Sequence, residues 1–309
     1  MESELDIYNM KKFCLIILFV LIINLRADAE SWVNFPESAD VGQAFAVSIT
    51  SDQDYQDPAV TWMDRVVKLD VEDGGLGKIS YGLLGSYVSK VKPGEYPIVF
   101  EFTQNDKRYK ARGVVILNPK DYPKEELKVQ QKMISPKKQD LPRIKREAQI
   151  VGKALRTMTD KRMWRTPPGT PLNTMTLTSH YGFHRVYNGV PRNGHAAADL
   201  RAAEGTNVKA PFDGTVILTG SHYYAGGSVY IDSGNGVITV FFHLSKILVK
   251  PGQQVKAGQL IAKSGSTGRV TGPHLHYGLN LAGHFVDPMP LYNTSITKML
   301  KLGQRARVN

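Results

Sequence analysis

The chain contains, near its C-terminal end, the stretch Gly272-Pro273-His274-Leu275-His276-Tyr277-Gly278-Leu279. Histidine alternates with an apolar residue here, and such alternation is typical of a β-strand. Side chains two positions apart lie on the same face of a strand, so His274 and His276 point into the same space. We therefore predict a strand on which one histidine binds a metal ion while the other faces the same cleft.

Two more fragments carry histidines, and all eight histidines of the chain lie within residues 180–284. The fragments are His195-Ala196-Ala197-Ala198-Asp199 and Phe242-His243-Leu244-Ser245. A catalytic zinc ion takes three nitrogen or oxygen ligands and keeps one position open for water. His195, Asp199 and His276 supply such a set, and the four-residue spacing of the first two lets them converge on one ion.

His243 and His274 then remain to act on the water and the substrate. The sequence has no His-Glu-x-x-His motif, so the glutamate base that helical zinc proteases place in that motif is missing. These observations predict a zinc hydrolase with one Zn2+ per chain.

The motifs around these residues resemble, in order, those of the lysostaphin/LytM-type zinc endopeptidases. The matching motifs are Tyr181-Gly182-Phe183-His184-Arg185, Asn188-Gly189, His195-x-x-x-Asp199, Gly205-Thr206, Ala210-Pro211, Gly214-Thr215-Val216, His243-Leu244-Ser245, Gly252-Gln253-Gln254-Val255, Gly258-Gln259, Gly265-Ser266-Thr267-Gly268, the run from Thr271 to His276, and Val286-Asp287-Pro288. The resemblance implies an antiparallel β-sheet groove and hydrolysis of peptide bonds in peptidoglycan. It also implies zinc on His195, Asp199 and His276, with His243 and His274 as the catalytic pair. Which of the two catalytic histidines takes the proton stays open.

Three positions depart from the family pattern. Ala197 stands where the family usually has Gly, Ser228 where it often has Asn, and Ser233 where it often has His. None of the three is a ligand. We expect Ala197 to narrow the floor of the groove, which affects substrate fit rather than metal binding.

Residues 1–29 have the pattern of a secretory signal peptide. Lys11-Lys12 precedes an apolar run at 13–25, and Ala27-Asp28-Ala29 is typical of a cleavage site. The alternative is a membrane anchor, but the run is short for a span. We expect an exported protein, periplasmic or extracellular, with no membrane span in its mature form. The single cysteine, Cys14, falls inside this segment, so cysteine is neither a zinc ligand nor a nucleophile.

The chain is strongly basic, with a formal net charge of +11. An exported basic protein meets anionic cell-wall polymer, and we expect electrostatic attraction to it. We expect no nucleic-acid partner because no nucleic-acid-binding motif is present. The alternative is that the positive charge serves only to keep the protein soluble.

Residues 30–118 are predicted to form a β-sandwich. Short alternating runs, separated by turn signals, occur at 45–49, 59–62, 78–81, 96–102 and 109–117. The last two runs predict a hairpin over Asn105-Asp106. The position of this region, before the metal-binding segment, resembles that of the immunoglobulin-like domain in some members of the family.

The remaining segments complete the predicted domain organisation. Residues 119–164 form a basic connector with a helix at about 141–160 and Asp140 as its N-cap. We expect the apolar stripe of this helix to pack on a neighbouring domain, with wall or membrane contact as the alternative. Residues 165–295 are predicted to form the zinc endopeptidase domain. Residues 296–309 are predicted to be a short basic tail that frays.

The other four histidines are assigned structural or surface positions. We expect His180, His184 and His222 at the surface, with His184 also considered as a substrate contact, and His284 in a loop. No further substrate-binding residue is predicted.

Three functions are compatible with these features. The favoured one is an exported endopeptidase that cuts peptide cross-links of peptidoglycan. The D-Ala–diamino-acid bond is favoured because nothing in the sequence points to an oligoglycine bridge. The alternative is a non-catalytic wall-binding regulator of other wall hydrolases on the same fold, but such proteins generally lack ligand residues that are all present here. The third compatible function is that of a wall-binding protein that acts through its first domain.

Overall fold

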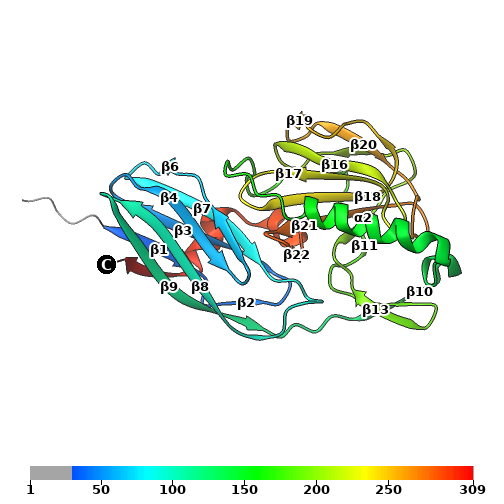
Figure 1. The fold of residues 1–309 in the computed structure, drawn as a ribbon, viewed down its shortest axis with the longest axis horizontal. Coiled ribbons are helices and arrows are strands. Elements are labelled where there is room, and N and C mark those ends of the chain that lie inside the picture. Colours follow the sequence, from blue (N-terminus) through cyan, green and yellow to red (C-terminus); the bar gives the residue numbers. More distant parts are fainter. Residues whose placement is uncertain (1–29, 309) are drawn as a thin grey trace, which may run out of the picture. The chain divides into compact units, whose positions relative to one another are not determined.

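The computed structural model describes residues 30–308 (Figure 1). The segment predicted to be a signal peptide, residues 1–29, lies outside the described residues. The described part is mainly β, as predicted, and its strands form four sheets. Among residues 30–308, no helix is both long and apolar enough to cross a membrane.

Two five-stranded sheets form the predicted β-sandwich. One sheet has the order β23 (Gln304–Val308), β1 (Ser31–Phe35), β3 (Ala44–Ser51), β7 (Lys78–Gly85), β6 (Glu72–Asp73). The other has the order β2 (Ser38–Asp40), β9 (Lys107–Asn118), β8 (Gly94–Gln104), β4 (Gln56–Trp62), β5 (Arg65–Lys68). Inward-facing side chains such as Val47, Trp62 and Phe100 are fully buried in the core that both sheets share. The closer likeness to an immunoglobulin domain stays a prediction.

Strands β8 and β9 form the predicted hairpin. They pair antiparallel up to Gln104 and Lys107, which flank the two turn residues. Asn105 and Asp106 have φ of 50° and 59°. A type I′ hairpin turn requires positive φ at both positions, and Asn and Asp adopt positive φ more readily than other non-glycine residues.

The C-terminal segment forms regular structure, which corrects our expectation that it frays. Helix α3 (Ile296–Lys301) begins after Ser295, whose hydroxyl accepts a hydrogen bond from the Lys298 amide at 3.2 Å. Strand β23 then pairs antiparallel with β1 at the edge of the sandwich, where Val308 is buried. An edge strand presents unpaired backbone groups, and β23 satisfies those of β1.

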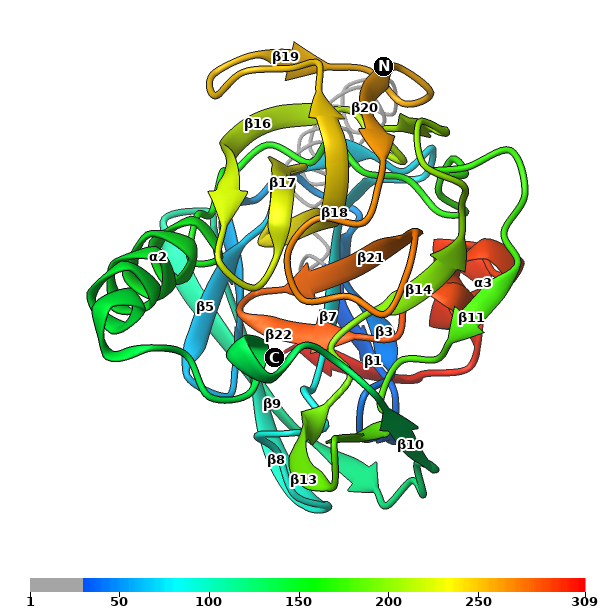
Figure 2. The same ribbon diagram turned by 90° about the vertical axis from the view of Figure 1, so that its right-hand side faces the viewer.

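The predicted zinc domain is built on an antiparallel sheet of ten strands (Figure 2). Seven follow the path β11 (Leu177–Ser179), β14 (Ala198–Arg201), β21 (His274–Leu281), β18 (Val237–Ile247), β17 (Gly226–Asp232), β16 (Gly214–His222), β19 (Gln254–Val255). The other three are β15 (Asn207–Lys209), β20 (Leu260–Ser264) and β22 (His284–Val286). The short helix η3 (Met289–Asn293) follows β22.

The connector contains a helix, α2 (Leu141–Ala154), which is shorter than predicted. Asp140 precedes it, but its side chain makes no capping hydrogen bond. At the other end of α2, the residues that follow it bond to the turn between β17 and β18. The Asn235 amide donates to the Thr159 carbonyl at 2.7 Å, and the Asn235 side chain donates to the Asp160 carbonyl at 2.9 Å.

The apolar stripe of α2 faces the zinc domain. Val151 and Leu155 pack against a buried cluster that contains Tyr230, Ile238 and Val240. These three residues belong to β17 and β18, so this end of the stripe packs on a neighbouring domain, as expected, whereas Ala148 of the same stripe is exposed.

The connector ahead of α2 joins two parts of the zinc domain. Strand β10 (Lys124–Leu127), which we did not predict, pairs parallel with β12 (His184–Tyr187), and β12 pairs with β13 (Val190–Gly194). The short helices η1 (Gln131–Met133) and η2 (Lys138–Asp140) follow. The Lys132 carbonyl accepts a bond from the Tyr223 hydroxyl at 3.0 Å, and the Ile134 carbonyl accepts one from Arg192 Nη2 at 3.1 Å. The connector therefore spans from the β12–β13 hairpin to the β16–β17 turn.

Candidate metal centre

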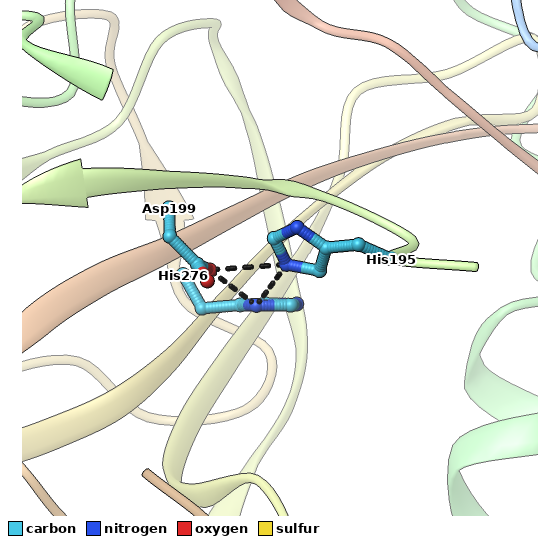
Figure 3. A group of neighbouring side chains, drawn as sticks. All are labelled: His195, Asp199 and His276. Atoms are coloured by element: carbon cyan, nitrogen blue, oxygen red, sulfur yellow. Dashed lines mark hydrogen bonds and ion pairs between the residues drawn. The ribbon is translucent and has the colours of Figure 1, made fainter. Parts of the chain in front are cut away.

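Strand pairing sets two of the three predicted ligands side by side. Strands β14 and β21 are antiparallel, and Asp199 is directly opposite His276 in their register. Opposed residues on neighbouring strands project to the same face of the sheet. His195 reaches the same point from the segment between β13 and β14, where its amide donates to the Phe183 carbonyl at 2.9 Å (Figure 3).

The donor atoms of these residues lie close enough to share one ion (Figure 3). Asp199 Oδ1 is 2.9 Å from His276 Nδ1 and 3.1 Å from His195 Nε2, and the two nitrogens are 3.2 Å apart. Ligands at about 2.0–2.2 Å from a tetrahedral zinc ion lie about 3.3–3.6 Å from one another, slightly further apart than these donor atoms lie. The three residues therefore fit zinc in both donor type and spacing.

Hydrogen bonding and burial prepare these groups for a metal. The Nδ1–H of His195 donates to the His180 carbonyl at 2.9 Å, which leaves Nε2 with its lone pair. Burial lowers the pKa of His276 to about 4, so its ring is neutral at neutral pH. Burial raises the pKa of Asp199, but the adjacent His195 and His276 outweigh it and hold that pKa well below its usual range. Metal binding requires a neutral imidazole and an ionised carboxylate, and His276 and Asp199 meet this requirement.

Arg185 holds the second oxygen of the Asp199 carboxylate. Its guanidinium bonds to Asp199 Oδ2, donates to Ser179 Oγ at 3.1 Å and lies 3.3 Å from Glu125 Oε2. Glu125 Oε2 also accepts a bond from Ser179 Oγ at 2.8 Å. This group orients the carboxylate from behind, as partners of metal ligands commonly do. We predicted no role for Arg185, although it lies within the 181–185 motif, and none for Glu125, which lies in the connector.

His243 and His274 lie next to this group. Their ring centroids are 4.8 Å apart, and the His243 ring is 5.6 Å from that of His276. The Nδ1–H of His243 donates to the Thr267 carbonyl and that of His274 to the Gly272 carbonyl, each at 2.8 Å. With Nδ1 used in this way, the acceptor of each ring in its neutral form is Nε2. Burial lowers the pKa of His243 well below its usual range, and the neighbouring His276 and His274 lower it further.

The backbone turns at His243 to bring this ring into place. Its φ is 64°, in the left-handed region, and its amide donates to the Ala225 carbonyl at 2.9 Å. Phe242, one residue earlier, stacks on the His276 ring with 4.8 Å between centroids and 7° between planes. A non-glycine residue held in this region stores about 1–3 kcal/mol of strain, and such strain concentrates at functional sites.

The histidines open onto a cleft of about 690 Å³. Its lining includes His195, His243 and His276, together with larger side chains such as Tyr187, Arg192, Tyr224 and Arg269. Asp199 and His274 line a smaller hollow of about 100 Å³. The two hollows share Arg185, Tyr187 and Arg269, so they adjoin. A groove on an antiparallel sheet is what the resemblance implied.

The other histidines lie outside this group. His180 and His184 are exposed, as expected, and His180 contributes its backbone carbonyl to the site. His222 is half-buried at the end of β16 and bonds through Nδ1 to Ser228 Oγ at 2.6 Å, which corrects its surface assignment. His284 was expected in a loop, but it begins β22 and is buried.

Ala197 does not narrow the cleft. Its side chain is fully buried, with Cβ beside Gly278 of β21, and its neighbour Ala196 lines the cleft instead. Ala197 lies in a bend just before β14 and is covered on all sides, so it does not form part of the cleft surface.

Comparison with known proteins gives consistent matches to this part of the chain. Residues 193–288 match the sequence model of Peptidase family M23. Peptidoglycan DD-endopeptidase ShyA of Vibrio cholerae is 52% identical over 95 residues, which are 31% of this chain and 22% of that protein. Peptidoglycan DD-endopeptidase ShyB of the same organism is 42% identical over 116 residues, 38% of this chain and 26% of that protein. The matched region thus spans about a fifth to a quarter of these relatives.

A structural neighbour extends beyond the metal-binding region. A crystal structure of a Pseudomonas aeruginosa protein assigned to peptidase M23 superposes with a TM-score of 0.61 and 26% identity. The match covers 82% of this chain and 94% of that one.

Proposed function

We propose that this chain, whose residues 193–288 form a peptidase domain of family M23, hydrolyses peptide cross-links of bacterial peptidoglycan. One observation carries the proposal. All five predicted residues lie together around two adjoining hollows, although two of them are more than 75 positions from His195 in sequence, and the donor atoms of His195, Asp199 and His276 have a spacing that fits zinc. The similarity to peptidoglycan DD-endopeptidases covers only part of those proteins, so it supports the proposal through the peptidase domain.

In the proposed chemistry, His195, Asp199 and His276 hold the metal through Nε2, Oδ1 and Nδ1 respectively. A zinc ion held there supplies a Lewis acid that activates water and polarises the scissile carbonyl. His243 and His274 face the same space with Nε2 available. One of them takes a proton from the water or orients it, and the other stabilises the developing oxyanion or protonates the leaving amine.

The bond that we propose is the one between D-Ala and the diamino acid of the neighbouring stem peptide. The relatives ShyA and ShyB are named peptidoglycan DD-endopeptidases, which supports this bond over an oligoglycine bridge. Because peptidoglycan lies outside the cytoplasm, the protein acts there, in the periplasm or outside the cell. The net charge of +11 supports attraction to anionic wall polymer, which high salt weakens.

Digestion of purified sacculi by zinc-loaded protein of residues 30–309 tests the proposal. We expect cross-linked muropeptide dimers to disappear and monomers to accumulate in the mass spectrum. His243→Ala protein with the same zinc content is the control and should leave the dimers intact. Intact dimers with cut glycan strands, or cut glycine bridges, would refute the proposed bond. Wall binding without turnover by zinc-loaded protein would favour the non-catalytic regulator instead.

A further inference from the structure

Arg269 lies in the cleft between two tyrosine rings. Its guanidinium carbon is 4.8 Å from the centre of the Tyr187 ring and 4.6 Å from that of the Tyr224 ring. Tyr187 belongs to β12 and Tyr224 to the turn between β16 and β17. Two separate elements therefore clamp one cation through their aromatic faces. Arg269 itself is on the loop between β20 and β21, half-buried at the cleft.

The loop that carries Arg269 is the one that orients His243. The Thr267 carbonyl accepts the His243 Nδ1–H bond at 2.8 Å, and the Arg269 amide donates to the Tyr224 carbonyl at 2.8 Å. Gly268, between them, has φ of 79°, and a Cβ at this position would lie 2.4 Å from the Gly226 amide nitrogen. Close packing and these bonds hold the Arg269 backbone in a fixed position relative to His243.

The positive charge of Arg269 is not neutralised by a protein carboxylate. Arg185, the other half-buried arginine of the cleft, pairs with Asp199 and Glu125. Within residues 30–308, no acidic side chain forms an ion pair with Arg269. Burial lowers the pKa of Arg269, and the charges of Arg185 and Arg192 add to that effect. A partly desolvated cation without a counter-ion is stabilised by an anion that enters the cleft.

We propose that Arg269 is a specificity residue that binds a carboxylate of the peptide being cut. This inference rests on the proposed function, because it takes a stem peptide as the substrate. A guanidinium offers a planar fork of N–H groups that matches a carboxylate with two parallel hydrogen bonds. The contacts of its guanidinium carbon with Tyr187 and Tyr224 are made to the ring centres rather than to hydrogen-bond acceptors, so its N–H donors remain available.

Two carboxylates of a cross-linked dimer lie nearest to the cut on its amine side and have the required chemistry. One is on the diamino acid, on the carbon whose amine forms the scissile bond. The other is the terminal carboxylate of the stem peptide that contains this diamino acid. Both lie on the amine side of the cut, and the experiment has to distinguish them.

Three purified dimers distinguish the two sources. The first has both carboxylates free, the second has the diamino-acid carboxylate amidated, and the third has the terminal carboxylate amidated. We expect amidation of the recognised carboxylate to lower kcat/KM of the zinc-loaded wild-type protein by about 10- to 100-fold, as expected for loss of a charge-assisted hydrogen bond. Amidation of the other carboxylate should change kcat/KM little.

Variants connect this preference to Arg269. In Arg269→Gln, kcat/KM on the free dimer should fall by the same factor, and the preference for the free carboxylate should disappear. Arg269→Lys should retain part of the preference for the free carboxylate. Arg305→Gln is the matched control, because Arg305 also stacks on an aromatic ring, at 4.4 Å over Trp32, but on strand β23 of the sandwich. It should keep the wild-type preference.

A binding measurement separates failure of this inference from failure of the proposed function. The Kd of each dimer is measured with zinc-loaded His243→Ala and with His243→Ala/Arg269→Gln. Cleavage by wild type without any carboxylate preference, or an equal loss on all three dimers in Arg269→Gln, overturns the inference and leaves the function standing. A carboxylate preference in binding that requires Arg269, without cleavage by wild type, supports the inference and refutes the proposed activity.

Discussion

Asp199 and His276 are directly opposed on the antiparallel strands β14 and β21, with Asp199 Oδ1 2.9 Å from His276 Nδ1. Sheet register, rather than helical spacing, therefore sets the distance between two of the proposed ligands. The backbone bonds of the sheet hold both residues before any metal arrives. Only His195 comes from outside a strand, and its ring is oriented by the His180 carbonyl.

The first prediction concerns this ligand set. His195→Ala, Asp199→Ala and His276→Ala should each lose zinc, because two remaining donors cannot hold the ion tightly. Wild-type protein should hold one zinc per chain, measured by elemental analysis after dialysis. A variant of this set that keeps full zinc content and full activity would contradict the assignment.

The second prediction separates the catalytic pair from the ligands. His243→Ala and His274→Ala should keep zinc and lose turnover by about 100-fold or more, the usual contribution of a general acid or base. Zinc content and sacculus digestion are measured on the same preparation. Loss of zinc in His274→Ala with retention in His276→Ala would show that these two roles are exchanged.

The third prediction concerns Arg185, which holds Asp199 from behind. Arg185→Gln removes the charge that pairs with the buried carboxylate, and zinc affinity should fall by about 10- to 100-fold. Competition with a chelator of known affinity measures it. Arg192→Gln is the matched control, since Arg192 lines the same cleft but is exposed and bonds to the connector at Ile134. Equal zinc affinity in both variants would show that Arg185 does not support the metal centre.

The fourth prediction is that acid destabilises the metal-free protein between pH about 6.5 and about 4. Burial lowers the pKa of His276 from 6.5 to about 4 in the folded state, and it lowers that of His243 as well. In this window the unfolded chain binds protons that the folded chain does not, so the free energy of unfolding decreases as pH falls. Urea unfolding at a series of pH values measures the slope. His276→Gln should flatten it, and an unchanged slope in that variant would contradict the assignment.

Local patterns were sufficient to predict much of this structure. Alternating histidines placed the strand over residues 274–281, and Asn105-Asp106 placed a hairpin turn, because both features depend on residues close in sequence. The five histidine and aspartate positions were recognisable because few residue types carry metal chemistry. Their convergence in space results from the pairing of strands, which the motifs do not themselves encode.

Features that depend on distant contacts were missed. Glu125 reaches Arg185 only because β10 pairs with β12, and nothing in the local sequence of the connector indicates that pairing. α2 ends at Ala154, and the chain beyond it bonds at Thr159 and Asp160 to Asn235, some 75 residues further on, a contact that the local sequence does not indicate. Ala197 was expected to line the groove, but it is fully buried, and its burial depends on neighbours that are distant in sequence, such as Gly278.

The C-terminal strand is the clearest such case and leads to the last prediction. Residues 304–308 have little apolar character, yet they complete the sandwich by pairing with β1 and burying Val308. Deleting residues 304–309 should lower the free energy of unfolding by about 2 kcal/mol or more, through lost apolar burial and unpaired backbone groups on β1. Val308→Ser keeps the backbone pairing and should cost about half as much, since only the buried side chain changes. Urea unfolding followed by tryptophan fluorescence measures both, with zinc content as a check that the metal centre is intact. Equal stability of the deletion and the wild type would mean that β23 contributes nothing to the sandwich and that its pairing with β1 is incidental.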